Sequence, residues 1–431
     1  MPATDLERAA ARVRRRLVPF LFLCYIFAYL DRINVGFAAL QMNAALGFSA
    51  AVYGFGAGIF FLSYTAFEIP SNVILARVGA RRWIARIMIS WGLLSSAMMF
   101  VHDATSFYVL RFLLGAAEAG FFPGIIYYLT RWVPAAERAR TVAAFMTAVL
   151  TAGIVGGPVS GALLTLDGAG GLAGWQWMFL LEGLPAAALG VVVLVVLTDR
   201  PADASWLTAP EREALTRQLA LESGDGVGAA TGRAHGVGDA LRHPWLWVLA
   251  LVYFVVPVAL YAFGFFLPQI LQATFDGTPF QIGLLSALPY LAGAVAMVVT
   301  ARVSDRTGER RAFVAVGAAV AGGAFVAAAF VTGLAPSLAL LSLAMLALAS
   351  MFGPFWTLAT SFVSGEGAAA GIALINSVGN IGGFIGPYAI GALRDATGGF
   401  SAGLIAVGVV VIAGGALVLV VPASGRERPQ R

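Results

Sequence analysis

Long apolar stretches follow one another along almost the whole chain, separated by short polar connections. A hydrocarbon core of about 30 Å is crossed by roughly 20 apolar residues in a helix. Twelve stretches reach about this length, at residues 17–40, 51–75, 84–101, 106–130, 141–163, 177–197, 243–271, 280–301, 312–333, 337–360, 368–392 and 399–421. The pattern predicts an all-α membrane protein with twelve transmembrane helices.

The placement of arginine in the connections predicts the orientation of these helices. Arginine clusters precede the first stretch, follow the second, fourth and eighth, and end the chain, whereas the alternate connections hold almost none apart from Arg394. Because positively charged residues accumulate in cytoplasmic loops, we expect both termini in the cytoplasm. Ten or eleven crossings would put one cluster on the wrong side.

Composition supports a membrane protein and offers no cofactor site. Hydrophobic residues make up 60% of the chain and charged residues 11%, against about 45–50% and about 25% in soluble domains. The single cysteine, Cys24, excludes a disulfide within the chain, and the three histidines lack metal-ligand spacing. We expect no metal, no cofactor and no nucleic-acid partner, and the chain offers no constellation typical of an enzyme.

The one long connection divides the chain into two groups of six stretches. The predicted organisation is an N-terminal bundle at 1–198, a cytoplasmic linker at 199–242, a C-terminal bundle at 243–425 and a tail at 426–431. Within the linker, residues 208–222 are typical of a short amphipathic helix with Thr208 as N-cap and Glu211 completing a capping box. The glycine-rich segment from Ser223 is expected to be flexible.

An internal repeat supports this division. The loop motif "RVGARR" begins at Arg77 and "RTGERR" at Arg306, and two Gly-Pro motifs have their prolines at Pro158 and Pro387. Both pairs are 229 residues apart. Many transporter folds are built from internal repeats of this kind.

The loop motifs resemble the cytoplasmic signature G-x-x-x-D-R-x-G-x-R-R of the major facilitator superfamily. The second copy, "ARVSDRTGERR", departs only at Ala301, whereas the first has Asn72 and Ala76 in place of the glycine and the aspartate. The resemblance implies a role in gating for both loops. The residues concerned are Arg77, Arg81, Arg82, Asp305, Arg306 and Arg310.

Further motifs resemble the anion:cation symporter family, in its bacterial tartrate, phthalate and sugar-acid branch. They are "YLDRINVGFAAL", "FEIPSN", "GARRWIARIMISWG" and "FLLGAAEAGFFPGIIYYLTRW", with Gln176 a departure where arginine is expected. This resemblance implies a proton-coupled importer of a small organic anion in the bacterial inner membrane. It would work by alternating access, as a monomer, with the anion, protons and the lipid bilayer as its partners.

Ionisable residues inside the apolar stretches are candidates for the transport site. Each costs roughly 2.5–3.5 kcal/mol to insert, so such residues mark substrate or proton pathways. The candidates are Asp31, Arg32, Glu68, Arg111, Glu118 and Glu182. At 1.5 Å per residue, Asp31 and Arg111 lie at similar depth and Glu118 is near the midplane. Arg111 and Glu118 share a helix face with Gly115, which is expected to leave room for a ligand.

We expect Arg32 and Arg111 to bind the carboxylate of the anion, since guanidinium stays charged and offers a fork of donors. Asp31 and Glu118 are carboxyl groups that can bind and release protons, and we expect Glu118 to have no partner. Tyr29 shares the face of Arg32.

The second half has no buried charge at the equivalent positions and would complete the pocket with neutral groups. Asn376 and Asn380 fit either interhelical hydrogen bonding or substrate binding, and Tyr64 is similar. The family resemblance favours binding for all three.

Three alternatives remain open from the sequence. Asp31 and Arg111 fit a purely structural ion pair between the first and fourth stretches, and Glu68 and Glu182 fit structural roles near helix ends. A facilitative carrier or an anion exchanger would use the same pocket without proton uptake. A membrane enzyme or a sensor finds less support, because no nucleophile, metal constellation or signalling domain is evident.

Overall fold

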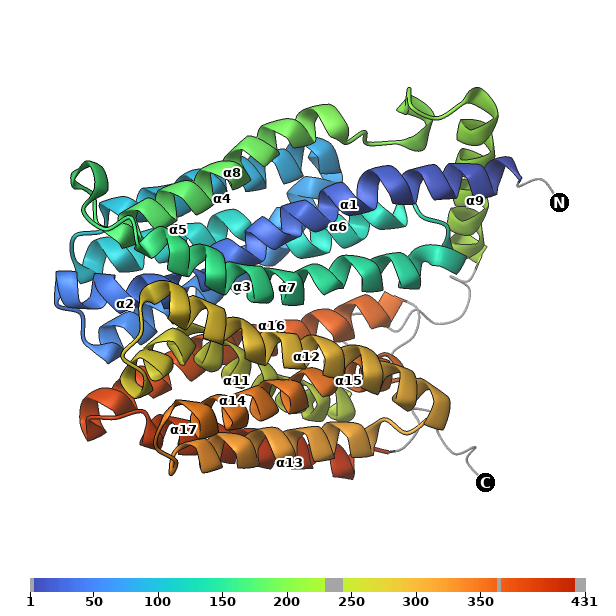
Figure 1. Ribbon diagram of the computed structural model, residues 1–431. Coiled ribbons are helices and arrows are strands. Elements are labelled where there is room, and N and C mark those ends of the chain that lie inside the picture. The colour runs from blue at the N-terminus through green and yellow to red at the C-terminus, as the bar shows by residue number, and fades with distance from the viewer. Residues whose placement is uncertain (1–3, 229–242, 363–365, 423–431) are drawn as a thin grey trace.

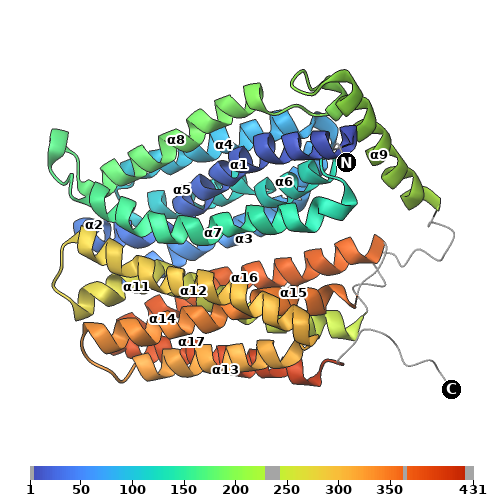
Figure 2. The same ribbon diagram turned by 45° about the vertical axis from the view of Figure 1, so that its right-hand side comes forward.

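A computed structural model describes residues 4–228, 243–362 and 366–422, and these residues form helices and no strands. The helices lie in two stacked groups, which are clearly separated in Figures 1 and 2. The first half holds α1–α9 and the second half holds α11–α17.

The first half contains α1 (Asp5–Ile33), α2 (Val35–Leu46), α3 (Ala50–Val78), α4 (Ala80–Ala97), α5 (Ala104–Glu118), α6 (Phe121–Thr130), α7 (Ala135–Leu164), α8 (Gly174–Val196) and α9 (Ala209–Gly228). The second half contains α11 (Pro244–Thr274), α12 (Pro279–Thr307), α13 (Arg311–Ala328), α14 (Leu334–Ser350), α15 (Phe352–Thr360), α16 (Glu366–Thr397) and α17 (Ser401–Ala416). Short 3-10 helices lie at Met98–Phe100, Ala169–Gly171, Pro201–Asp203 and Leu417–Val420.

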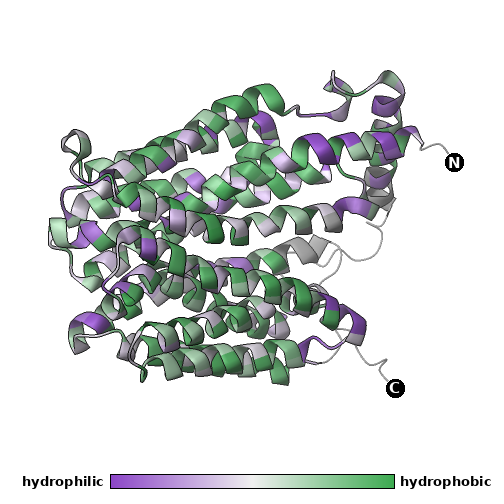
Figure 3. Ribbon diagram, viewed as in Figure 1, coloured by the Kyte–Doolittle hydropathy of each residue, from purple (hydrophilic) through white to green (hydrophobic). Residues whose placement is uncertain are grey.

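Eleven helical stretches of the described chain are long and apolar enough to cross a membrane. The remaining expected crossing, 368–392, lies within α16, which is helical over 32 residues but is not among the eleven. Figure 3 shows hydrophobic colour along the helices and hydrophilic colour gathered at α9 and the start of α1. The protein is therefore a multi-pass membrane protein.

The molecule has two distinct ends. The start of α1 and the whole of α9 lie at one end, here called the α9 end, and α2 lies at the opposite end, here called the α2 end (Figures 1 and 2). Arg12 of α1 pairs with Glu211 of α9 at 2.9 Å. The arginine cluster that precedes the first stretch thus contacts the connection between the halves through Arg12.

The internal repeat is visible in the packing between the halves. α3 lies against α16, and α12 lies against α7. A Cβ on Gly54 would collide with the carbonyl oxygen of Pro387, and one on Gly283 would collide with that of Gly157. Gly54 and Gly283 are 229 residues apart, so two equivalent close crossings join the halves.

At the α2 end, a carboxylate of the second half binds the first turn of α3. Asp395 of α16 accepts hydrogen bonds from the backbone N–H groups of Ala50 and Ala51, at 2.9 and 2.8 Å. The first N–H groups of a helix have no partner within the helix. Asp395 thus caps α3 from across the interface, beside the cap that Ser49 provides to Val52.

The connection between the halves is more helical than expected. The helix predicted at 208–222 continues to Gly228, so the flexible segment does not begin at Ser223. Residues 229–242 of that segment lie outside the described residues. The Thr208 N–H does bond to Glu211 Oε2 at 2.9 Å, as one half of the expected capping box.

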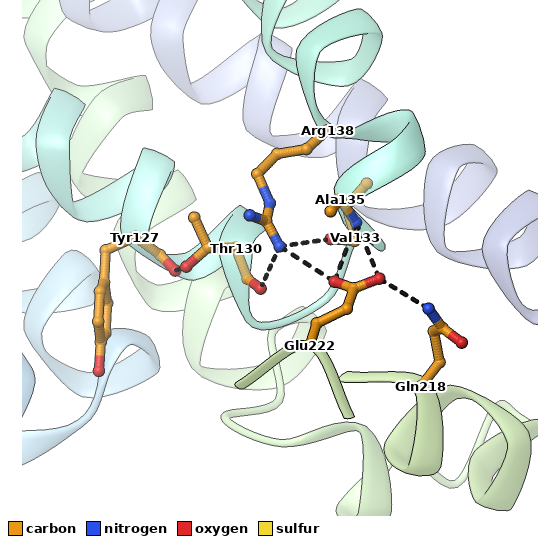
Figure 4. A network of polar contacts seen from close by, with 7 residues as sticks. All are labelled: Tyr127, Thr130, Val133, Ala135, Arg138, Gln218 and Glu222. Atoms are coloured by element: carbon orange, nitrogen blue, oxygen red, sulfur yellow. Dashed lines mark hydrogen bonds and ion pairs between the residues drawn. The ribbon is translucent and has the colours of Figure 1, made fainter. Parts of the chain in front are cut away.

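The carboxylate of Glu222 attaches α9 to the first half (Figure 4). It accepts from the backbone N–H of Ala135, the first residue of α7, at 3.0 and 3.2 Å, and from Gln218 at 2.9 Å. Arg138 reaches the same carboxylate at 3.5 Å. The last turns of the linker helix therefore cap α7, which gives α9 a fixed place on the first half.

We expect Asp395→Ala to lower the thermal stability of the purified protein. The change removes an N-cap acceptor, and such losses cost about 0.5–2 kcal/mol. The measurement is the melting temperature in detergent. Asp276→Ala is the matched control, because Asp276 is an exposed aspartate in the α11–α12 connection with no side-chain partner in the described structure. Equal melting temperatures for the two variants would contradict the capping role.

Candidate functional site

Arg32 lies at the contact between the two halves. Its guanidinium forms an ion pair with Glu118 of α5 and a hydrogen bond, at 3.1 Å, to the hydroxyl of Tyr261 on α11. Arg32 and Tyr261 are 229 residues apart, which makes them equivalent positions of the repeat. Two equivalent positions can touch only if both lie close to the pseudo-twofold axis that relates the two halves.

Aromatic rings hold the Arg32 guanidinium on its other sides. Its carbon lies 5.3 Å from the ring centre of Phe60 and 5.4 Å from that of Tyr64, both on α3. A desolvated arginine over an aromatic face gains about 2 kcal/mol or more. The side chain is 11% exposed, and its buried Nε has no hydrogen-bond partner. One donor of the fork is therefore unoccupied.

Both members of the ion pair lie at helix interruptions. α5 ends at Glu118, and Gly120 adopts φ +86° before α6 begins, a conformation that disfavours any residue but glycine. α1 ends next to Arg32, and the helical pattern resumes after Asn34. The sequence predicted one continuous crossing at 106–130. Broken helices inside a membrane are tolerated where they are buried in protein or line a cavity, and transporters use them at binding sites.

Glu118 was expected to have no partner, and this was wrong. It is 2% exposed and paired with Arg32. Sequence spacing gives the position of a side chain along its helix, but position alone does not show which neighbouring helix presents a side chain to Glu118.

Asp31 points away from the interface, into the first half. Its carboxylate accepts from Trp91 Nε1 at 2.7 Å and from Ser95 Oγ at 2.9 Å, both on α4. It is 1% exposed. The possible ion pair between Asp31 and Arg111 is not formed, because the Asp31 side chain faces α4. The next residue, Arg32, faces a different direction and lies at the contact between the halves.

Arg111 is buried against α3. It donates to the backbone carbonyls of Gly56 and Ala57, at 3.3 and 2.9 Å, and lies over the rings of Phe60 and Phe265. No carboxylate of the described residues pairs with it. In this arrangement it ties α5 to α3.

Gly115 does not leave room for a ligand, contrary to the expectation. A Cβ at this position would collide with the carbonyl oxygen of Phe60 and with Ser63 Oγ. The glycine instead permits α5 to approach α3 closely. This approach brings Arg111 and Glu118 up to the helix that carries Phe60 and Tyr64.

The second half presents neutral polar groups to α3. Asn376 donates to Glu68 Oε1 of α3 at 3.3 Å, and the buried Nδ2 of Asn380 has no partner. Contacts between the antiparallel helices α3 and α16 set their register: Gly54 meets Pro387, Gly58 meets Phe384, Phe61 meets Gly383 and Glu68 meets Asn376. This register places Asn380 opposite Tyr64.

Of the two predicted tyrosines, Tyr64 lies at the Arg32 guanidinium and Tyr29 lies away from it. Tyr64 contacts the Arg32 guanidinium, as described. Tyr29 is 3% exposed and packs with Ile33 and with Ala152 of α7. Sharing a helix face with Arg32 therefore does not bring Tyr29 to the ion pair.

Tyr261 and Phe60 contact the Arg32 guanidinium and were not among the predicted site residues. Tyr261 was detectable, since the 229-residue repeat maps it onto Arg32. Phe60 carried no signal among many apolar residues. Glu68, for which a structural role near a helix end was one alternative, lies at the interface and accepts a hydrogen bond from Asn376.

Glu182 belongs to a separate buried contact. It is 3% exposed and accepts from Ser160 Oγ at 2.7 Å, within the first half. Its contact joins α8 to α7.

The loop residues lie at the α9 end. Arg81 donates from its backbone to Asp199 and from Nε to the carbonyl of Leu194, at 3.0 and 2.7 Å, which links the α3–α4 turn to the end of α8. Arg310 pairs with Asp305 at 3.0 Å. The side chains of Arg77, Arg82 and Arg306 are exposed.

Comparison with known proteins gives consistent matches over the whole chain. The family model for the Major Facilitator Superfamily matches residues 21–387 and 249–430. The chain is 50% identical over 424 residues to "Putative tartrate transporter" of Agrobacterium vitis, covering 97% of this chain and 93% of that protein. It is 42% identical over 415 residues to "Putative metabolite transport protein NicT" of Pseudomonas putida, covering 96% and 94%.

Solved structures show the same fold at low sequence identity. A bacterial homologue of the human lysosomal transporter Spinster, inward-facing and occupied, superposes with a TM-score of 0.79 at 18% identity, covering 97% of this chain and 99% of that chain. A D-xylose–proton symporter superposes with a TM-score of 0.74 at 14% identity, covering 95% and 99%.

We expect Gly115→Ala to reduce the yield and thermal stability of folded protein, because overpacking against a backbone carbonyl costs about 1–3 kcal/mol. The measurement is the melting temperature and the monodisperse fraction in size-exclusion chromatography. Gly323→Ala is the control, since a Cβ there meets nothing within 4 Å. If Gly115→Ala matched Gly323→Ala, the close approach of α5 to α3 would not be a constraint.

Proposed function

Because this chain belongs to the Major Facilitator Superfamily, whose members are transporters and not enzymes, we propose that it carries a small organic anion across the membrane together with protons. Two relatives named "Putative tartrate transporter" support a carboxylate as the substrate. The two halves would rock about the site between them, with both termini in the cytoplasm and the bacterial inner membrane as the location.

The Arg32 guanidinium is the observation that carries this proposal. It is a fixed cation held between the halves, and its buried Nε is unoccupied. A substrate carboxylate would bind this fork, which matches carboxylate geometry. Tyr64, Asn376 and Asn380 would complete the pocket, and the unpartnered Nδ2 of Asn380 is a second free donor.

Coupling would follow from competition for Arg32. A substrate carboxylate that binds Arg32 displaces Glu118 from its ion pair. A buried carboxylate without a cationic partner is costly, and uptake of a proton by Glu118 removes that cost. Substrate and proton would therefore enter the site together and leave it together.

The remaining predicted residues have supporting roles in this scheme. Asp31, buried against Trp91 and Ser95, would be a second proton carrier. Arg111 would reach the substrate only if α5 moved away from α3, and Tyr29 would act through the packing of α1 on α7. The loop residues Arg81 and Asp305 would act in gating at the α9 end.

A facilitative carrier or an exchanger for the same anions is the nearest rival. It would use the pocket of Arg32 without protonation of Glu118. The rival differs from the symporter in one measurable respect, namely whether a proton gradient drives accumulation.

We expect Arg32→Ala to abolish binding of tartrate while leaving folded protein, and Arg32→Lys to restore little of it, because lysine lacks the fork. The measurement is isothermal calorimetry or a ligand-induced shift of the melting temperature. Arg86→Ala is the control, since Arg86 lies in α4 over Trp83 and outside the site. Wild-type affinity in Arg32→Ala would remove Arg32 from the binding site.

We expect Glu118→Gln to keep exchange of labelled for unlabelled anion and to lose accumulation driven by a proton gradient. Glutamine resembles the protonated acid but cannot release a proton. Both assays use the same proteoliposomes, with Glu182→Gln as a buried carboxyl control outside the site. Full accumulation in Glu118→Gln would exclude it as an essential proton carrier, and wild-type uptake indifferent to the gradient would favour the facilitative carrier.

A further inference from the structure

Glu68 is a third carboxylate close to the Arg32 site, and the proposed mechanism does not use it. It is partly exposed, whereas Asp31 and Glu182 are buried. Asn376 Nδ2, at 3.3 Å from Glu68 Oε1, is the one side-chain partner of this carboxylate in the described structure. The contact joins α3 of the first half to α16 of the second.

The position of Glu68 relative to Arg32 follows from α3. Tyr64, whose ring lies 5.4 Å from the Arg32 guanidinium, precedes Glu68 by four residues. Residues four apart share one face of a helix, and the step along the axis is about 6 Å. Arg32 and Glu68 thus lie at neighbouring levels of one surface, with no ion pair between them among the described contacts.

An anion site with a carboxylate beside it is selective by its chemistry. A carboxylate repels a second negative charge, and it accepts hydrogen bonds strongly from donors such as hydroxyl groups. A ligand that presents a carboxylate to Arg32 and a hydroxyl group to Glu68 satisfies both ends of this surface. A dicarboxylate without hydroxyl groups leaves Glu68 opposed to an apolar or negatively charged part of the ligand.

We propose that Glu68, oriented by Asn376, accepts a hydrogen bond from a hydroxyl group of the bound anion, so that hydroxylated carboxylates are the preferred substrates. This inference rests on the proposed binding of a carboxylate at Arg32. Glu68 is then the specificity-determining residue of the site and Asn376 is a positioning residue.

A purely structural role for the Glu68–Asn376 contact predicts a different result. A contact that only joins the halves would affect the affinity for all anions alike. A hydrogen-bond acceptor for the ligand affects only those anions that carry the donor. Sites built to bind a substrate hydroxyl group reject analogues lacking it by large factors, because their polar groups are left unpaired.

The experiment compares L-tartrate with succinate, which share a four-carbon dicarboxylate skeleton and differ by two hydroxyl groups. Dissociation constants are measured for the wild type, Glu68→Gln, Glu68→Leu and the control Glu182→Gln. We expect the wild type to prefer tartrate by at least tenfold. We expect Glu68→Leu to lose most of this preference, by weaker tartrate binding and tighter succinate binding, and Glu68→Gln to lose part of it.

The outcomes separate this inference from the function on which it rests. A preference unchanged in Glu68→Leu, with both anions still binding, overturns the role of Glu68 and leaves carboxylate transport intact. Loss of gradient-driven uptake in Glu68→Gln without a change in preference also overturns it, and assigns Glu68 to proton transfer. Failure of the wild type to bind either anion overturns the proposed function and this inference together.

Discussion

The guanidinium of Arg32 is the constraint from which the rest of the site follows. A permanent charge between two helical bundles in a low-dielectric environment must be compensated, and the structure supplies Glu118, a tyrosine hydroxyl and two aromatic rings. These groups come from three different helices, since Glu118 lies on α5, the tyrosine hydroxyl on α11 and both rings on α3. Three features bring these partners to the guanidinium: the helix break at Gly120, the close approach of α5 to α3 at Gly115, and the contact of α11 with the first half.

Much of the architecture was predictable because it depends on properties read along one chain. Hydropathy located eleven of the twelve expected crossings, and the 229-residue offset revealed the repeat. The identity of the contacts was not predictable, because helical periodicity gives the face of a side chain but not the helix opposite it. An ion pair of Asp31 with Arg111 was therefore open as an alternative, whereas Asp31 contacts Trp91, and Glu118 was left without Arg32. Gly115 also has two opposite interpretations, space for a ligand or close packing, which sequence alone does not separate.

The division of labour between the halves is unequal. The first half carries the buried charges, whereas the second presents Tyr261, Asn376 and Asn380, which are neutral. Neutral partners give hydrogen bonds without fixing one charge arrangement, so the halves can part without breaking an ion pair of the described residues. The contacts that cross the interface near the site are of this kind, and the ion pair itself stays within the first half.

The contact of Arg32 with Tyr261 bears on the ancestry of the chain. If the two halves arose by duplication of one six-helix unit, their equivalent positions on the symmetry axis once held identical residues. Two guanidinium groups facing each other there would repel at close range. The contact of an arginine with a neutral tyrosine avoids this repulsion. The arrangement at the axis therefore requires the two halves to differ at these two equivalent positions.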